Sequence, residues 1–326
     1  MFRLKSTHWF TLILLLLALP LSATAQDKNK DKKDKKALTG TPVMWRAPED
    51  IAQRNLILGA GGEEMKPDIS RVTFIEQKTG GYSTKYRVKD AKGNEWVAKI
   101  GKEAQPDTAA NRLLWALGYE TQIAYVIPKL TIECKGEFEN VRLEARPADV
   151  KRSGNWMWED NPFLNAPEFK GLKILMVMIN NWDMKDDNNE ILAPRGDDTG
   201  QGELRYIISD LGGSFGKTGG VISRSRNNPS DYVKADFIKG VKGDVIDFNY
   251  NGKNQKLFEG ITVADAAWLS KWLNQLSDEQ IRDAFRAANY TPEEVETLAI
   301  AFKARANALT TFAPKGTPKV EIKISN

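Results

Sequence analysis

Residues 172–189 read LKILMVMINNWDMKDDNN, an apolar run that changes abruptly into amides and carboxylates. Residues 172–179 are apolar on nearly every side of a helix, and a helix of that kind is buried. Asn165 and Glu168 have the spacing of a capping box at its start. The buried helix is therefore predicted to be followed directly by a cluster of polar side chains. Asp and Asn also favour caps and turns, so a plain turn cluster is the alternative interpretation.

A β-hairpin with a long loop is predicted directly after this polar cluster. Its strands are residues 190–192 and 204–209, and the second strand ends in the tripeptide DLG at residues 210–212. The ends of one helix and two strands would then present the carboxylates of Asp183 and Asp210 together with nearby amides. Hard divalent cations prefer such oxygen ligands, so the sequence predicts a site for a metal and phosphate.

The N-terminus has the pattern of a secretory signal peptide, predicted over residues 1–25. Arg3 and Lys5 precede an apolar run at residues 10–19, and residues 23–25 read ATA, an Ala-x-Ala cleavage site. The run is short for a membrane span, which needs about 20 residues. We therefore expect an exported protein, periplasmic or secreted, without stable membrane insertion.

A lysine-rich segment at residues 26–40 is predicted to be a disordered tether, because it cannot bury apolar surface. Residues 1–36 hold eight cationic and three acidic side chains, so the remainder carries a net charge of −1 although the whole chain carries +4. A near-neutral remainder predicts no basic groove for nucleic acid.

The sequence contains a single histidine, His8, and a single cysteine, Cys134. His8 lies in the predicted signal peptide, so the expected mature chain contains no histidine. This excludes histidine-dependent triads, histidine zinc sites and thiolate metal clusters. Carboxylates, lysines and asparagines remain, and these residues suit oxygen-bound Mg²⁺ or Mn²⁺.

An antiparallel meander is predicted at residues 71–77, 84–88 and 95–100, since each segment alternates or is rich in β-forming residues. The turn between its first two strands contains Gly80 and Gly81. A phosphate-binding turn and an ordinary hairpin turn both fit this pair of glycines.

Lys99 lies in the third of these strands, within the sequence VAKI. Its apolar neighbours disfavour a fully exposed position. A helix is predicted at residues 107–117, with Pro106 at its start and Gly118 at its end. Asp107 in the first turn can pair with Lys99, or it can simply complement the helix dipole.

The predicted fold class is α+β, with a β-rich N-terminal half and a mainly helical C-terminal half. Further strands are predicted at residues 122–134 and 140–145. Helices are predicted at residues 262–273, 276–288 and 292–309, the last two with capping signatures at their starts.

Together these motifs resemble the protein-kinase-like superfamily over residues 70–310, as an order of elements. Asp183-x-x-x-x-Asn188 resembles the kinase catalytic loop, and the DLG at residues 210–212 resembles Asp-Phe-Gly. The sequence DTAANRL at residues 107–113 and the NWD before Asn188 are similar to the atypical branch that includes HipA-type and phosphatidylinositol kinases. The chain departs from ordinary protein kinases in having Asn-Trp in place of His-Arg before Asp183.

The resemblance implies a bilobal protein-kinase-like fold, with an N-terminal lobe at residues 41–145 and a C-terminal lobe at residues 146–326. It also implies an ATP-dependent phosphotransferase that uses Mg²⁺ or Mn²⁺ and acts on a hydroxyl group. The implied roles are phosphate binding by Lys99, support of Lys99 by Asp107, nucleotide contact by Gly80 and Gly81, proton acceptance by Asp183, phosphoryl stabilisation by Lys185, and metal binding by Asn188 and Asp210.

Two further function classes stay open at this point. The first is an exported pseudokinase, which would bind nucleotide or act as a scaffold without catalysis. The second is a metal-dependent phosphohydrolase, which would use the same carboxylates but lacks the bridging histidine expected there. The sequence identifies neither the hydroxyl-bearing substrate nor the oligomeric state.

Overall fold

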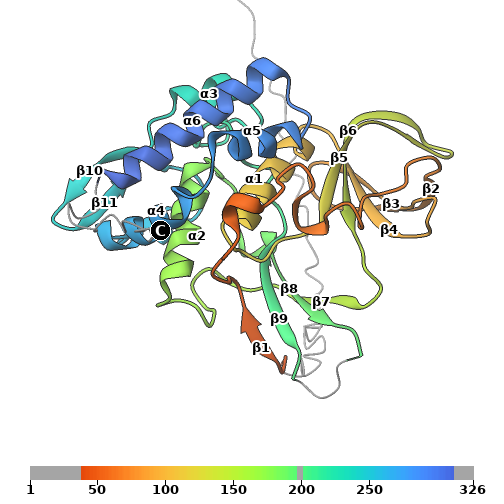
Figure 1. The fold of residues 1–326 in the computed structure, drawn as a ribbon, viewed down its shortest axis with the longest axis horizontal. Coiled ribbons are helices and arrows are strands. Elements are labelled where there is room, and N and C mark those ends of the chain that lie inside the picture. The colour runs from red at the N-terminus through yellow and green to blue at the C-terminus, as the bar shows by residue number, and fades with distance from the viewer. Residues whose placement is uncertain (1–37, 197–200, 312–326) are drawn as a thin grey trace, which may run out of the picture. The chain divides into compact units, whose positions relative to one another are not determined.

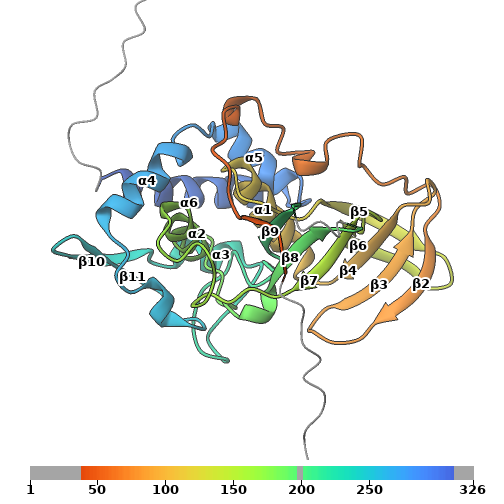
Figure 2. The ribbon, with the colours of Figure 1, turned by 90° about the horizontal axis from the view of Figure 1, so that it is seen from below.

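A five-stranded antiparallel sheet dominates the N-terminal half of the chain. The computed structural model describes residues 38–196 and 201–311, so the predicted signal peptide and most of the predicted tether lie outside the described residues. Figure 2 shows the strands side by side in the order β2-β3-β4-β6-β5. Their bounds are β2 (Thr73–Lys78), β3 (Thr84–Lys89), β4 (Glu95–Ile100), β5 (Ala124–Ile132) and β6 (Gly136–Ala145).

A second sheet joins segments that are far apart in the sequence. Its order is β1-β9-β8-β7, and the predicted hairpin forms its centre as the antiparallel pair β8 and β9. The short strand β1, which the sequence did not predict, pairs in parallel with β9 (Figure 1). The bounds are β1 (Thr41–Val43), β7 (Val150–Gly154), β8 (Asn189–Pro194) and β9 (Glu203–Ile208).

Most of the remaining regular elements are helices, and a small hairpin of β10 and β11 accompanies them (Figure 1). The helices are α1 (Ala104–Ala116), α2 (Pro167–Met178), α3 (Pro229–Lys234), α4 (Val263–Leu273), α5 (Asp278–Arg286) and α6 (Pro292–Thr310). The hairpin strands are β10 (Ile238–Lys242) and β11 (Val245–Phe248). Short 3₁₀ turns are η1 (Ile51–Gln53), η2 (Gly59–Gly61), η3 (Asp186–Asn188) and η4 (Gln255–Phe258). No helix within the described ranges has both the length and the apolar character needed to cross a bilayer.

Two predicted capping boxes are confirmed and one is wrong. Ser277 and Thr291 each exchange hydrogen bonds with the third residue of the helix that follows. The box predicted from Asn165 and Glu168 does not form, because α2 begins at Pro167 and has no side-chain cap. Proline has no N–H and a fixed φ, so it favours the first helical position and moves the helix start by one residue.

Two hydrophobic cores support the two halves of the chain. The smaller core is built from the five-stranded sheet and includes the buried side chains of Trp96 and Leu143. The larger core holds α2, where Ile174 and Val177 are fully buried, and it also takes the apolar side chains of α1 such as Leu113. Helix α1 therefore contacts both the sheet and α5. The predicted fold class is confirmed: the protein is α+β, with a β-rich N-terminal lobe and a mainly helical C-terminal lobe.

Candidate functional site

A buried ion-pair cluster joins β4, α1 and the residues after β9. Lys99 Nζ lies 2.9 Å from Asp107 Oδ2 and 3.1 Å from Asp210 Oδ1, and Glu103 is 3.7 Å away. Lys99 is only 4% exposed. Burial opposes the charged form of Lys99, but Asp107 and then Asp210 outweigh it, so the pKa of Lys99 lies above its ordinary value. The lysine is therefore held in its charged form.

A row of cations crosses three neighbouring strands at this point. Lys99 on β4 is directly opposite Lys85 on β3 and Arg142 on β6. Like charges at directly opposite positions destabilise a sheet, so a row of this kind needs anions nearby. Lys85 makes no ion pair in the part of the chain that the structure describes, but its charge helps to lower the pKa of Asp210. The sheet thus presents a cationic face toward Asp210.

Arg142 is the most deeply buried member of this row, at 1% exposed. It donates hydrogen bonds to Glu144 at 2.9 Å and to Gln122 at 2.6 Å, and it lies 3.6 Å from Asp107 Oδ1. Burial opposes its charge, but Asp107 and Glu144 raise the pKa of Arg142 above its ordinary value. Asp107 therefore lies between two buried cations and fixes the position of Lys99.

The loop after α2 positions Asp183. The chain leaves the helix through Asn180, which has a φ of 51°, and asparagine tolerates that left-handed conformation better than most residues. The carboxylate of Asp183 contacts Lys253 at 2.6 Å and Lys185 at 3.0 Å. The backbone of Asp183 donates to Asn181 Oδ1 and accepts from Asn188 Nδ2. The loop is thus braced on both sides of the carboxylate.

A buried arginine from α6 supports the start of this loop. Arg305, 5% exposed, donates to the carbonyl of Met178 at 2.8 Å and to Asn180 Oδ1 at 2.8 Å. It also donates to the carbonyls of Tyr232 and Ala235. One side chain near the end of the described chain therefore links α2, its loop and α3.

Asn188 and Asp210 lie side by side because the carbonyl of Asn188 accepts hydrogen bonds from the amides of Ser209 and Asp210. Asp210 Oδ1 accepts from Lys99 and from the Gly212 amide. Burial opposes ionisation of Asp210, but Lys99 and that amide outweigh burial, so the pKa of Asp210 lies below its ordinary value. The carboxylate is therefore ionised near neutral pH.

These two residues offer suitable oxygens for a hard cation. Asp210 Oδ2 and Asn188 Oδ1 carry no hydrogen bond in the part of the chain described. Within that part, no group of three acidic, histidine or cysteine side chains could hold a metal alone. A protein that supplies few ligands fits Mg²⁺, which commonly keeps waters and takes further oxygens from substrate phosphates. The donor set thus fits a metal that is shared with a phosphorylated ligand.

A cavity of about 600 Å³ brings most of the predicted site residues together. Six of them line it: Gly81, Lys99, Asp183, Lys185, Asn188 and Asp210. Asp107 is buried behind Lys99, and Gly80 is not among the residues that line the cavity. A side chain at Gly81 would meet Lys85 Nζ at 3.2 Å, so the turn lies close to the cationic row.

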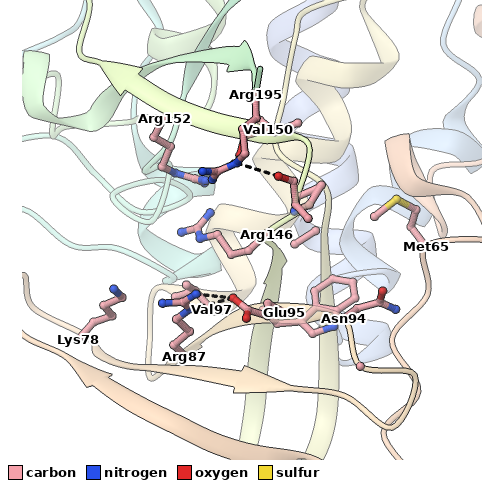
Figure 3. Close-up of a pocket in the computed structure, with 15 residues that line it drawn as sticks. Met65, Lys78, Arg87, Asn94, Glu95, Val97, Arg146, Val150, Arg152 and Arg195 are labelled. Carbon is pink, nitrogen blue, oxygen red and sulfur yellow. Dashed lines mark hydrogen bonds and ion pairs between the residues drawn. The ribbon is translucent and has the colours of Figure 1, made fainter. Parts of the chain in front are cut away.

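A second cavity of about 560 Å³ adjoins the first, since Val97 and Arg146 line both. Figure 3 shows basic side chains around it, among them Arg87, Arg152 and Arg195. Arg195 donates to the carbonyls of Ala148 and Val150, and Arg87 pairs with Glu95. The two cavities are thus neighbours, with Lys99 in the lining of one and an arginine-rich wall in the other.

Several residues of this site escaped the sequence analysis. They are Lys85, Glu103, Arg142, Arg226 and Lys253. Only strand register could have identified Lys85 and Arg142, because an exposed and a buried basic residue look alike in a single strand. The other three reach the site from positions outside the strands that carry no local signal.

The comparisons with known proteins assign the chain to no family. No family model and no curated protein matches the chain. Among solved structures, a proinflammatory kinase of Helicobacter pylori, CtkA, is similar over 77% of this chain and 100% of its own, with 12% identity and a TM-score of 0.47. A Golgi casein kinase with Mn/ADP bound covers 76% and 73%, with 8% identity and a TM-score of 0.37. The Rio2 kinase of Chaetomium thermophilum covers 74% and 72%, with 10% identity and a TM-score of 0.30. These partial overlaps are with protein-kinase-like chains and say nothing about activity.

Proposed function

We propose that this protein is a phosphotransferase that binds a nucleoside triphosphate, with ATP as the expected donor, together with Mg²⁺ or Mn²⁺. The observation that carries the proposal is the cationic row of Lys85, Lys99 and Arg142 facing Asp210. Carboxylates pair with Lys99 and Arg142, whereas Lys85 lines the cavity without an ion pair in the part of the chain described, so a further anion placed beside Lys85 and Lys99 would be favourable. A polyphosphate is such an anion, and it also supplies the oxygens that a metal at Asp210 would need.

Asn188 and Asp210 are the proposed metal holders, through the two oxygens without hydrogen bonds. The metal, when bound, neutralises charge on the phosphate oxygens. Lys99 contributes a fixed positive charge in a water-poor position, where it acts more strongly than it would in water. The protein's part is therefore to place and neutralise the phosphates.

The proposed transfer requires a proton acceptor, and Asp183 is positioned for that role. An acceptor hydroxyl oxygen forms a bond to the terminal phosphorus, the bond from that phosphorus to the bridging oxygen breaks, and the nucleoside diphosphate leaves. The hydroxyl proton passes to the carboxylate of Asp183. Lys185, 3.0 Å from that carboxylate, lies where it can neutralise the transferred group.

The second cavity is the proposed place of the nucleoside. It adjoins the phosphate region through Val97, whose side chain lines both spaces. Arg146 also lines both, and a guanidinium can stack on a flat base and donate hydrogen bonds to it. An extended nucleotide can therefore reach from this wall to Lys99 without leaving the two cavities.

A binding module without turnover is the second candidate, and one observation favours it. Both carboxylate oxygens of Asp183 contact a lysine, at 2.6 Å from Lys253 and 3.0 Å from Lys185. An acceptor hydroxyl would share its carboxylate oxygen with a lysine, and that lysine makes the oxygen a weaker proton acceptor. A protein in which this weakening prevents proton transfer would bind nucleotide and transfer nothing.

Nucleotide binding and transfer measured together test the proposal. ATP with Mg²⁺ or Mn²⁺ should raise the melting temperature, since a ligand of the folded state stabilises by about 2.7 kcal/mol at a hundredfold excess over Kd. Labelled phosphate should then pass to an added hydroxyl compound or protein. Binding without transfer would favour the second candidate. No shift with any nucleotide and either metal would overturn both.

We also propose that the protein acts outside the cytoplasm, on the strength of the signal-peptide pattern at residues 1–25. N-terminal sequencing of chain recovered from the exported fraction should begin at Gln26. A chain that keeps Met1 and stays in the cytoplasm would contradict this proposal.

A further inference from the structure

The segment that follows the DLG tripeptide is unusually basic. Residues 213–230 contain Lys217, Arg224 and Arg226 and no carboxylate. Arg224 and Arg226 both line the cavity that contains Asp183. The segment therefore brings positive charge to the side of the cavity where the acceptor group must enter.

Three cationic side chains lie over the ring of Trp182, the residue next to Asp183. The guanidinium carbons of Arg224 and Arg226 lie 3.9 Å and 4.7 Å from the ring centroid, and Lys253 Nζ lies 5.8 Å away. Trp182 is 3% exposed, so the ring is a fixed platform. Cation–π contacts of this kind hold the arginine side chains in place beside the proposed reaction centre.

The three cations on the ring differ in their partners. Arg226 pairs with Glu103, and Lys253 pairs with Asp183. Arg224 makes no ion pair and no side-chain hydrogen bond in the part of the chain that the structure describes. Among the acidic residues that line the cavity, Asp187 has no ion-pair partner in the described part of the chain. Of the three cations on the Trp182 ring, Arg224 is thus the one available to an incoming anion. Its stacking on Trp182 fixes the position of its guanidinium.

Three large apolar side chains near Arg224 and Arg226, in sequence or in space, are exposed to an extent that is rare for their type. Val221 and Ile222, on the turn just before Arg224, are 80% and 101% exposed. Tyr82, which stacks on Arg226 at 4.5 Å, is 75% exposed. Apolar residues that border a charged cavity mark a binding surface more often than isolated exposed ones do. The ligand of this surface should therefore have apolar as well as acidic groups.

We propose that the acceptor is an acidic polypeptide, which binds along residues 221–226 with a carboxylate on Arg224 and an apolar side chain on Val221 and Ile222. A polypeptide is favoured over a small acid because its successive side chains can place an apolar group on the turn while a carboxylate contacts Arg224. The role as acceptor rests on the proposed phosphotransferase function, whereas the binding itself does not.

Binding of matched peptides tests this inference without any nucleotide. Two short fluorescent peptides, each with one Ser and one Leu, carry either Glu or Lys at the flanking positions. The Glu peptide should bind to the full chain, and rising salt should weaken it, because part of the attraction is electrostatic. The Lys peptide should bind at least about tenfold more weakly, a difference of about 1.4 kcal/mol. Equal binding of both peptides would overturn the inference.

Variants separate the charge from the apolar contact. Arg224→Glu should weaken the Glu peptide by about tenfold or more and reverse the salt dependence, while Arg224→Lys should retain much of the affinity. Lys89→Glu, the same charge change at an exposed position on β3, should leave binding unchanged. Val221→Ser with Ile222→Ser should lower affinity equally at low and high salt. An effect of Lys89→Glu as large as that of Arg224→Glu would contradict a specific site.

Two further readouts distinguish this inference from the proposed function. Thermal shifts with ATP and metal should be the same in the wild type and in the variant with Val221→Ser and Ile222→Ser, because neither residue lines the cavity that holds the proposed phosphate site. Peptide binding without any nucleotide shift would support the surface and remove the phosphotransferase. Sedimentation that shows a dimer lost on Val221→Ser with Ile222→Ser, with no peptide bound, would mean that a second copy covers the surface and the inference is wrong.

Discussion

Lys99 Nζ lies 3.1 Å from Asp210 Oδ1, although 111 positions separate the two residues in the sequence. The contact joins a strand of the N-terminal sheet to the residues that follow β9 in the C-terminal half. Both groups are charged, and each shifts the pKa of the other toward that charged state. The pair therefore fixes the spacing between the two surfaces that the proposed phosphates would contact.

Removal of the Asp210 carboxylate should abolish metal dependence. In Asp210→Ala, ATP should still raise the melting temperature through the cationic row, but Mg²⁺ should add nothing to the shift. Asp187→Asn, an exposed acid of the same cavity, is the matched control and should retain the metal effect. Differential scanning fluorimetry with and without Mg²⁺ measures both. A metal effect that persists in Asp210→Ala would place the metal elsewhere.

Asp183→Asn should separate binding from transfer. The amide cannot accept a proton, so phosphate transfer should fall by about 10²- to 10⁴-fold, while the ATP-induced thermal shift should stay within experimental error of the wild type. Single-turnover assays with labelled ATP measure the rate. Unchanged transfer in Asp183→Asn would mean that another group takes the proton.

Asp107→Asn should destabilise the protein strongly. The change leaves the buried charges of Lys99 and Arg142 without a shared partner, and loss of one member of a buried pair costs about 3–5 kcal/mol. Urea unfolding measures the difference. Asp50→Asn removes an exposed partner of Arg54 and should cost less than about 1 kcal/mol. A double variant with Arg142→Met should recover part of the loss, because Arg142 would no longer place a second buried cation directly opposite Lys99.

The contribution of the Lys99–Asp210 pair should depend on pH at both extremes. The pKa of Asp210 lies below its ordinary 3.8, so its stabilisation is complete above that value and is lost as the pH falls through the folded pKa. The pKa of Lys99 lies above its ordinary 10.5, so its stabilisation is complete below that value and is lost as the pH rises through the folded pKa. The stability gap between wild type and Asp210→Asn should be level near neutral pH and shrink at both ends. A gap that grows in strong acid would contradict the pairing.

The order of elements could be read from the sequence because each has a local signature. The apolar run of α2, the strands of the hairpin β8–β9 and the capping residues of α5 and α6 depend on neighbours in the chain, and the structure has them where they were predicted. The motif spacing also indicated which carboxylates to examine, and Asp183 and Asp210 do line one cavity. The chemical roles assigned to them stay predictions.

Contacts between residues that are far apart in the sequence could not be predicted. The parallel pairing of β1 with β9 has no local signal, since three residues form no recognisable pattern. The position of Arg142 opposite Lys99 depends on the register between β4 and β6, and a shift by one residue would turn Arg142 to the other face. The stacking of Arg224 on Trp182 arises only when two loops meet.

The hydrogen bonds of Arg305 also impose an order of events during synthesis of the chain. Ribosomes add residues from the N-terminus at about 5–20 per second, so the loop that carries Asp183 leaves the ribosome well before α6 does. Until Arg305 arrives, the carbonyl of Met178 and the side chain of Asn180 lack the donor that braces them. The loop of the proposed reaction centre can therefore gain this support only after α6 has been synthesised, and a chain truncated before α6 would carry every candidate site residue without the hydrogen bonds of Arg305.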